Sequence, residues 1–211
     1  MHTPRFHQLV TSVEELTTLI GLPSELVIKK QLAELDEHMR AFIAAAPFFL
    51  LGTVDREGRC DVSPRGDAPG LVRILDPQTL VIPERRGNRR ADSLRNILQT
   101  GRVGLLFLIP GIGETLRVNG RACLIRDEEV LAPLAVAGKP PLLGIAVEIE
   151  ECFLQCAKAI LRAKLWDGRA GGCQALQPCF AEILLEQTKI EGQTVASLDQ
   201  LIQDSYTNKL Y

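Results

Sequence analysis

The sequence predicts a mainly β protein, an antiparallel barrel or sandwich with helices at both ends of the chain. Two observations point to this class. Between residues 47 and 149, short apolar runs follow one another closely and are separated by turns rich in glycine and proline, as in antiparallel barrels and sandwiches. Before and after this region, apolar residues instead recur every three or four positions, as they do on one face of a helix.

These changes of pattern divide the 211 residues into three expected segments. They are an N-terminal helical extension at 1–46, a β-barrel domain at 47–168 and a C-terminal helical extension at 169–211. A chain of this length can bury a substantial core, either as one domain with appendages or as two small domains.

The N-terminal segment predicts two helices. Ser12 and Glu15 have the Ser-x-x-Glu spacing of a capping box, and apolar residues follow at helical spacing as far as Gly21. A longer helical pattern runs from Pro23 to residue 46 and ends there, because the residue before a proline is disfavoured in helical geometry. His38 lies in this second pattern, and we interpret it as a surface or hydrogen-bonded side chain rather than a ligand.

The strands are expected from apolar or alternating runs bounded by turn residues such as Asp76-Pro77 and Pro110-Gly111. These runs lie at residues 48–54, 59–63, 71–75, 79–83, 103–109, 114–125 and 145–149. Helical patterns return at 127–135, from Cys152 to Trp166, at about 175–187 and at about 195–205. The strands therefore occupy the middle of the chain, with helices on either side.

The turn after the run 79–83 is unusually basic. Five arginines fall within eleven residues there: Arg85, Arg86, Arg89, Arg90 and Arg95. A turn between a strand and a helix start offers free backbone N–H groups, the helix adds partial positive charge, and guanidinium groups bind oxyanions in pairs. The pattern indicates a phosphate site, and a solvated basic turn is an equally good interpretation from spacing alone.

Composition argues against several other classes. The formal net charge is −2 and aromatic residues make up 5%, so a nucleic-acid binder is not expected. No apolar run is long enough to cross a bilayer, and residues 1–5 lack the pattern of a signal peptide. The six cysteines form no Cys-x-x-Cys pair, and we expect reduced thiols in a cytoplasmic protein.

Histidine is scarce, which limits the chemistry of a site. His2, His7 and His38 all precede the expected barrel. A histidine-based zinc site or a Ser/His/Asp triad inside the barrel would therefore be hard to assemble. The sequence predicts no metal site.

Several stretches together resemble the pyridoxamine 5′-phosphate oxidase-like, FMN-binding split-barrel proteins. They are Val62–Asp67, Gly87–Ile97, Val103–Phe107, Glu114–Ala122, Cys156–Lys158 and Leu165–Asp167. The resemblance covers roughly residues 10–170 and is greatest for a bacterial branch distinct from the true vitamin B6 oxidase. It implies a six-stranded antiparallel split β-barrel and a homodimer, with FMN sites at the subunit interface to which both subunits contribute.

The resemblance also implies which residues contact FMN. The family's phosphate-binding positions fall on Arg65, Asn88, Arg89 and Arg90, with Ser63 as a ribityl or phosphate donor. Backbone contacts to the ring and ribityl chain would come from Ile82, Pro83 and Glu84, and ring contacts from Thr115 and Arg117. An ordinary strand threonine and a structural ion pair remain open alternatives for the last two. Trp166 either covers a partner's flavin or packs the C-terminal helix.

The function that the resemblance implies is an FMN-dependent oxidoreductase that transfers hydride through flavin N5, with an unknown small substrate and no catalytic residue identified. One alternative is a non-catalytic flavin carrier or sensor. Another is a split barrel that uses a deazaflavin or haem. The vitamin B6 oxidase reaction is not expected, because residues after Trp166 lack the family's Trp-x-x-x-Arg-Leu-Pro-like segment.

Two nearly continuous apolar runs support dimerisation. They are Val103–Ile109 and Leu142–Ile149, and they hold more apolar residues than one barrel interior needs. An apolar exterior requires a partner. The alternative is that the terminal helices of the same chain cover these faces.

Overall fold

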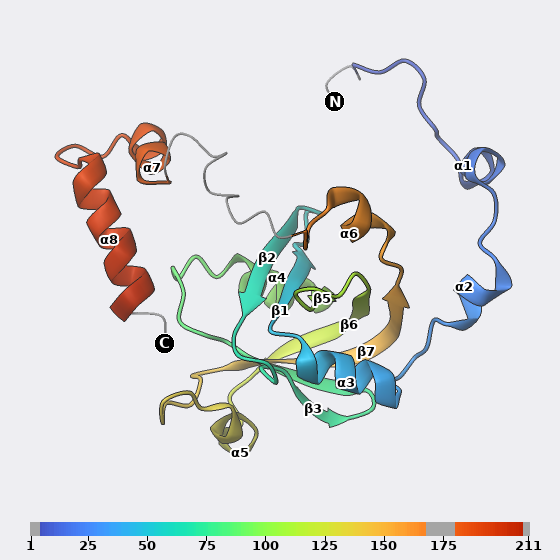
Figure 1. Cartoon of the computed structure of the whole chain (residues 1–211), viewed down its shortest axis with the longest axis horizontal. Coiled ribbons are helices and arrows are strands. Elements are labelled where there is room, and N and C mark those ends of the chain that lie inside the picture. Colours follow the sequence, from blue (N-terminus) through green and yellow to red (C-terminus); the bar gives the residue numbers. More distant parts are fainter. Residues whose placement is uncertain (1–4, 168–179, 209–211) are drawn as a thin grey trace.

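A computed structural model describes residues 5–167 and 180–208, and its strands form one antiparallel sheet (Figure 1). The strands are β1 (Phe48–Val54), β2 (Cys60–Gly66), β3 (Arg73–Asp76), β4 (Thr79–Pro83), β5 (Arg102–Leu108), β6 (Thr115–Ile125) and β7 (Gly144–Gln155). The helices are α1 (Val13–Ile20), α2 (Glu25–Lys29), α3 (Glu37–Ala45), α4 (Asp92–Thr100), α5 (Glu128–Leu131), a 3-10 turn (Ala132–Leu134), α6 (Lys158–Ala163), α7 (Phe180–Thr188) and α8 (Val195–Asn208).

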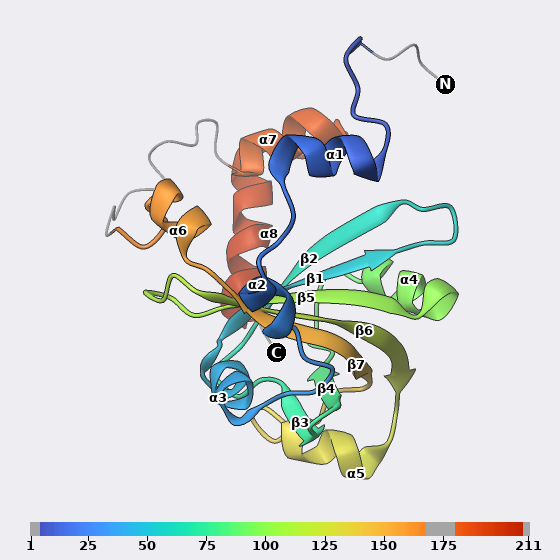
Figure 2. The same ribbon diagram turned by 90° about the vertical axis from the view of Figure 1, so that its right-hand side faces the viewer.

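The mainly β class with flanking helices is confirmed. The seven runs expected as strands all form strands, one more than the six strands that the family resemblance implies. Seven strands pair in the order β2-β1-β5-β6-β7-β4-β3, and all pairs are antiparallel. The seventh strand arises because the short β3 pairs with β4 at the edge. The sheet curls strongly but its two edge strands, β2 and β3, do not pair with each other, so the barrel is not closed (Figure 2).

The core lies inside the curled sheet. Alternate residues of β1 and β5 point inward and are buried, as the two-residue period of a strand requires. Phe49 and Phe107 face each other across this pair, with ring centroids 4.9 Å apart. Helix α3 adds Met39 and Ile43 to the same core. The β region and the helix that precedes it therefore share one hydrophobic core.

The single long helix expected from Pro23 to residue 46 is instead two helices with an extended segment between them. Leu32 pairs with Cys152 of β7, its N–H lying 3.0 Å from the Cys152 carbonyl oxygen. Asp36 then caps α3 by accepting a 2.7 Å hydrogen bond from the N–H of Met39. A strand-like pairing and a new N-cap interrupt the helix, although the apolar spacing continues through it.

The helix expected to begin at Cys152 is also wrong over its first residues. Strand β7 continues to Gln155, because the first part of β6 pairs with residues 151–155 across a bulge at Asn119/Gly120. The bulge is tight: a Cβ atom on Gly120 would lie 2.0 Å from the carbonyl oxygen of Glu148. No side chain fits there without a backbone shift.

The buried thiol of Cys152 lies where the N-terminal segment crosses β7. Its Sγ is 3.2 Å from the carbonyl oxygen of Glu34, and burial raises the pKa of this thiol to about 11. Cys60, Cys123 and Cys156 are exposed free thiols. Cys152 is therefore expected to be much less reactive than these three.

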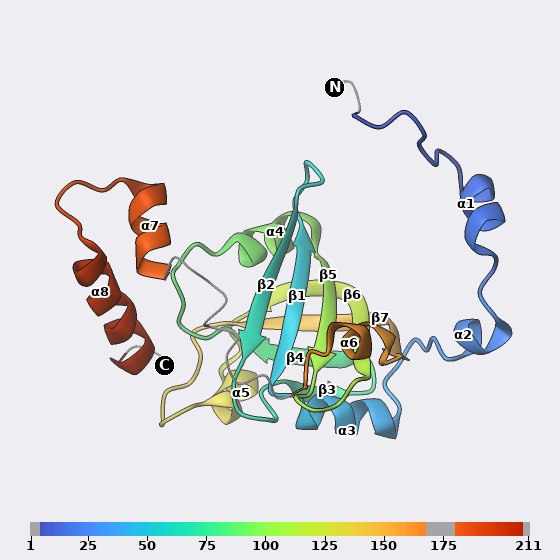
Figure 3. The same cartoon turned by 45° about the horizontal axis from the view of Figure 1, so that its top comes forward.

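The terminal helices stand on opposite sides of the barrel (Figures 1 and 3). Helices α1, α2 and α8 contain no buried residue. The helix expected at 175–187 lies outside the described residues as far as residue 179, and its remaining part corresponds to α7, which is described from Phe180.

Trp166 packs near the barrel and donates a 2.7 Å hydrogen bond to the carbonyl oxygen of Ile112. None of the helices in the described ranges has the length and apolar character needed to cross a bilayer.

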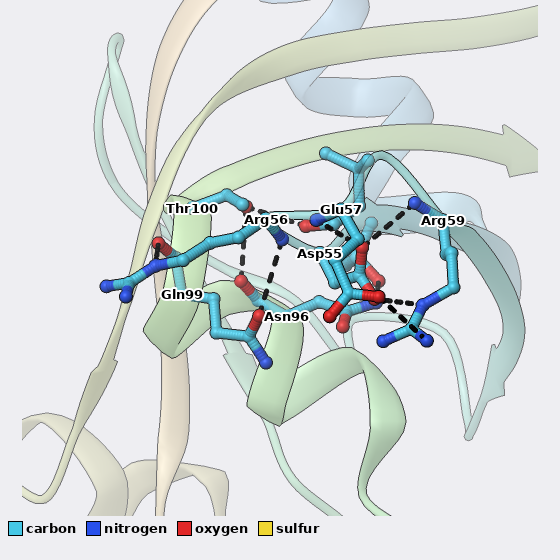
Figure 4. Close-up of polar contacts among 9 residues, drawn as sticks. Asp55, Arg56, Glu57, Arg59, Asn96, Gln99 and Thr100 are labelled. Carbon is cyan, nitrogen blue, oxygen red and sulfur yellow. Dashed lines mark hydrogen bonds and ion pairs between the residues drawn. The ribbon is translucent and has the colours of Figure 1, made fainter.

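A polar clamp joins the β1–β2 hairpin to α4 (Figure 4). Arg56 donates to Gln99 through both its backbone N–H and its Nε, and Thr100 donates to the carbonyl oxygen of Val54. Asn96 donates a 3.0 Å hydrogen bond to the hydroxyl of Thr53. These contacts fix the position of α4 on the sheet.

Asp55 holds the same hairpin in shape. Its carboxylate accepts from the N–H groups of Glu57 and Arg59, each at 2.9 Å, and from Arg59 Nε at 2.6 Å. These hydrogen bonds, led by that from the Arg59 backbone, lower the pKa of Asp55. The ionised carboxylate is thus favoured in the folded hairpin.

We expect the stability contributed by Asp55 to be lost in acid. Because its pKa is lower in the folded protein, this contribution is complete above the ordinary aspartate value of 3.8 and falls as the pH decreases through the folded value. Asp55→Asn should lower the unfolding temperature at pH 7 and flatten its dependence on pH below 4. Thermal unfolding between pH 2 and 7 measures both effects. Glu57→Gln, which changes an exposed carboxylate of the same turn, should leave the profile close to wild type.

Candidate functional site

A cavity of about 1300 Å³ opens beside α4. It lies where four segments meet: the second half of β2, the end of β4 with the arginine turn (residues 84–91), the start of α4, and the loop at 136–143 that precedes β7. Strands β2 and β4 lie far apart in the order of the sheet. The curl of the sheet, the α4 clamp and the loop therefore bring these segments together.

The face of β2 that lines the cavity is polar. Asp61, Ser63 and Arg65 alternate along the strand and share this face. Ser93, in the first turn of α4, donates a 2.7 Å hydrogen bond from its hydroxyl to Asp61 Oδ2. The hydroxyls of Ser63 and Ser93 are 3.0 Å apart, and Arg65 Nε donates to Ser63 Oγ at 3.3 Å. A continuous hydrogen-bonded chain thus links β2 to the start of α4.

Arg65 also forms an ion pair with Glu84 of the arginine turn. Both side chains are largely buried, with 17% and 22% of their surface exposed. The backbone N–H of Glu84 donates to the carbonyl oxygen of Leu143 at 3.0 Å, so the turn is held from both sides. The Glu84 carboxylate is compensated and does not face the cavity as a lone negative charge.

Arg85 anchors the turn and is not free for a ligand. Its Nε lies 2.7 Å from Asp67 Oδ2, and the Asp67 side chain is only 5% exposed. Its Nη1 donates to the carbonyl oxygen of Leu134 at 2.8 Å. Arg85 thereby ties the arginine turn both to the residue after β2 and to the segment after α5.

The backbone of the turn is unusual before α4. Arg89 and Ala91 both have left-handed conformations, with φ of 62° and 58°, and Asn88 Oδ1 accepts a 3.0 Å hydrogen bond from the N–H of Arg90. Ala91 occupies the N-cap position and has no side chain to accept from the first turn of α4. The first N–H groups of the helix are therefore left for another acceptor.

The cations of the cavity differ in their partners. Arg90 pairs with Asp92, and this hydrogen bond and charge raise the pKa of Arg90. Within residues 5–167 and 180–208, the side chains of Arg86, Arg89 and Lys139 make no ion pair. Free cations beside an uncapped helix start can bind an anion such as a phosphate. The rest of the lining includes apolar side chains from Leu71, Leu94 and Leu143.

The structure gathers most, but not all, of the residues expected to contact FMN. Those that line the cavity are Ser63, Arg65, Pro83, Glu84, Asn88, Arg89 and Arg90. The side chain of Ile82 is buried in the core instead. Thr115 and Arg117 lie on β6, away from the lining, and Arg117 stacks over the ring of Phe153 at 5.4 Å. The role of each residue in binding stays a prediction.

Sequence reasoning missed Asp61, Ser93 and Lys139 as lining residues, whereas Arg86 belongs to the basic turn that it singled out. For two of the missed residues, the sequence itself contained an indication that they belong to the site. Asp61 precedes Ser63 and Arg65 by two and four positions, which places all three on one face of a strand, and Ser93 stands at the expected helix start. Lys139 closes a tight turn at residues 136–139, and nothing in the local pattern indicates that this turn reaches the arginines.

No group of three or more His, Cys, Asp or Glu side chains suited to a metal ion occurs in the part of the chain that the structure describes. The donors that line the cavity are guanidinium, ammonium, hydroxyl and backbone N–H groups, and its carboxylates accept hydrogen bonds from arginine or serine side chains.

Comparison with known proteins identifies a family. Residues 35–156 match the family model described as pyridoxamine 5′-phosphate oxidase. No curated protein matches the chain. Among solved structures, HupZ from Group A Streptococcus is similar at 18% identity over 58% of this chain and 94% of that one, with a TM-score of 0.49. General Stress Protein 26 from Bacillus anthracis is similar at 14% identity, over 56% and 91%, with a TM-score of 0.44. An FMN-binding protein from Syntrophomonas wolfei follows at 13% identity, over 61% and 90%, with a TM-score of 0.41.

Proposed function

Since the chain belongs to the pyridoxamine 5′-phosphate oxidase family, matched over residues 35–156, we propose that the cavity beside α4 binds FMN and that the protein is an FMN-dependent oxidoreductase. The observation that carries this proposal is the start of α4. It lacks a capping side chain and faces the same cavity as Arg86 and Arg89, which have no ion pair among the described residues. A terminal phosphate dianion supplies both the acceptor and the charge that such a site lacks.

The donor set fits the phosphate of FMN. Arg86 and Arg89 are available to the oxyanion, the N–H groups of α4 provide further donors, and Asn88 keeps the turn in shape through Arg90. The carboxylates of Asp61 and Glu84 are already engaged by Ser93 and Arg65. Of the two carboxylates, Glu84 is neutralised by its ion pair with Arg65. Asp61, whose hydroxyl partner is neutral, acts electrostatically on Arg90 of the same cavity.

In this proposal the flavin ring receives contacts from two subunits, because one chain does not bring all the expected ring-binding residues to its own cavity. Apolar lining from Leu71, Leu94 and Leu143 suits a flat ring. Thr115 and Arg117 do not reach the cavity of their own chain. In our proposal they contact the flavin of a second subunit, in a homodimer whose sites lie at the interface. Each site would then be completed by β6 of the partner.

FMN, when bound, supplies hydride transfer at N5, and the unknown small substrate gives or takes that hydride. The chain's own residues bind, orient and exclude water, so little acid–base machinery is needed. This agrees with a cavity whose lining, as far as residues 5–167 and 180–208 form it, includes no histidine. We further propose a cytoplasmic location, in line with the four free thiols of the described residues. We propose no membrane or nucleic-acid partner.

The test is the visible absorption spectrum of the purified protein, followed by release and identification of any chromophore. We expect a two-banded flavin spectrum and free FMN after denaturation. A colourless protein that also fails to bind added FMN would contradict the proposal, and a released deazaflavin or haem would replace it. Sustained NADH or NADPH consumption with an electron acceptor would then separate an enzyme from a passive flavin binder.

A further inference from the structure

The N-terminal arm, which we define as residues 6–29, exposes apolar side chains along its whole length. Eleven large hydrophobic residues of this segment are exposed: Phe6, Leu9, Val10, Val13, Leu16, Leu19, Ile20, Leu22, Leu26, Val27 and Ile28. Neither α1 nor α2 buries a single residue. Soluble proteins rarely expose so many neighbouring apolar side chains unless a partner covers them.

The arm leaves the barrel at a firmly held point. Lys30 Nζ donates a 2.8 Å hydrogen bond to the carbonyl oxygen of Leu154, Leu32 pairs with Cys152, and the N–H of Leu35 donates to Pro77 at 2.8 Å. From this point the arm runs outward, away from its own sheet (Figures 1 and 3). Its exposed surface is therefore not covered by the chain to which it belongs.

The total surface of the chain leads to the same conclusion. Its accessible surface is 15082 Å², whereas a compact monomer of this mass exposes roughly 9,700 Å². The excess of about 5,000 Å² is comparable to the area that stable homodimers bury in total, roughly 2,000–5,000 Å² or more. The arm contributes to this excess together with α7 and α8, which also stand away from the barrel, and an arm that closes onto another subunit would remove the arm's part of it.

The outer face of β2, β1 and β5 provides a matching apolar surface. Strand register places Phe48, Leu50, Val62, Leu106 and Leu108 on this one face. Phe48 and Val62 are 36% and 64% exposed, and Leu50, Leu106 and Leu108 are half-buried. Gly52 and Gly104 lie between them in the same rows and leave the face flat. A second helical layer can pack on such a face.

We propose that the N-terminal arm of one chain packs on the outer face of β2, β1 and β5 of a second copy. A two-fold dimer suits this arrangement, because each copy has one arm and one receiving face and both contacts form at once. The inference rests on the homodimer of the proposed function and adds the element that joins its subunits. It does not depend on what the cavity binds.

Photo-crosslinking of the full-length protein tests the proposal. Leu22 lies between α1 and α2 and is 81% exposed, so p-benzoylphenylalanine at this position should report what the arm touches. We expect a covalent dimer after irradiation, with crosslinked peptides from β1, β2 or β5. The same group at Glu129, an exposed position on α5 outside the receiving strands, is the control and should give little dimer. Crosslinks only within one chain, or none, would overturn the proposal.

A second variant measures how much the arm contributes. Leu19→Ser, Ile20→Ser and Leu26→Ser together should raise the dimer dissociation constant at least tenfold in sedimentation experiments. The matched control changes polar residues of the arm, Glu14→Ser and Thr18→Ser, and should leave it within twofold. An unchanged constant in the apolar variant would overturn the proposal.

The outcomes also separate this inference from the proposed function. A dimer that binds FMN but gives no crosslinks between chains removes the arm contact and keeps the FMN site. A protein that crosslinks between chains but binds no FMN keeps the arm contact and removes the FMN site.

Discussion

Replacing Gly120 with alanine is expected to lower the unfolding free energy by about 3–5 kcal/mol, in the range of the most damaging core substitutions. The added Cβ would lie 2.0 Å from the carbonyl oxygen of Glu148, 3.0 Å from its carbon and 3.2 Å from Ile149 Cα. These are backbone atoms of the paired strand, which cannot rotate away. The β6–β7 ladder around the bulge must therefore separate, and it is the longest pairing in the sheet.

Gly104→Ala is the matched control for this prediction. Gly104 also lies in a central strand, and its nearest neighbour would be Asn119 Oδ1 at 3.1 Å. That atom belongs to a side chain that can shift, so a loss of no more than about 1 kcal/mol is expected. Urea unfolding at pH 7 measures both variants. Equal losses in the two proteins would show that backbone contact at the bulge is not the cause.

Arg89→Ala is expected to weaken FMN binding about 10- to 100-fold, from the loss of one charge-assisted contact worth roughly 1.5–3 kcal/mol. Arg89 lines the cavity and has no carboxylate partner among the described residues. All the N–H donors of its guanidinium are therefore available to the ligand, whereas Arg65 and Arg85 are paired with carboxylates. Flavin fluorescence titration measures the dissociation constant.

Two controls separate phosphate binding from general damage. Arg95→Ala removes an exposed arginine of the same basic cluster that does not line the cavity, and it should change FMN affinity less than twofold. Riboflavin has no phosphate, so its affinity should be the same in Arg89→Ala and in wild type. If Arg89→Ala weakened both flavins alike, the arginine would not bind the phosphate.

The sequence predicted the β-rich centre well, because each strand has a clear apolar run or alternation between turn residues. Its errors come from tertiary context. The segment around Leu32 and the residues from Cys152 to Gln155 have helical spacing, but pairing with a strand overrides it in both places. A two-residue or four-residue period indicates which side chains share a face and cannot indicate whether another strand is available to pair.

The candidate site was predictable in part for a similar reason. The density of arginines from 85 to 95 marks the turn, and the strand and helix around it are local features. Which arginines are free is not local: Arg85 is engaged by Asp67 and by a carbonyl near the 3-10 turn, and Arg65 is engaged by Glu84. These partners are separated in sequence by 18 or more positions and are known only from the fold.

The hydrogen-bonded chain on β2 has a direction, and this direction limits what Ser63 can do for a ligand. Ser93 gives its only hydroxyl proton to Asp61, so Ser63 must be the donor in the contact between the two serines. The hydroxyl proton of Ser63 is then used in this hydrogen bond, and its oxygen can still accept one from a ligand. A phosphate oxygen only accepts, whereas a sugar-alcohol hydroxyl can donate. In our proposal Ser63 is thus matched to the hydroxyls of a ribityl chain, and the phosphate is left to the arginines and the helix.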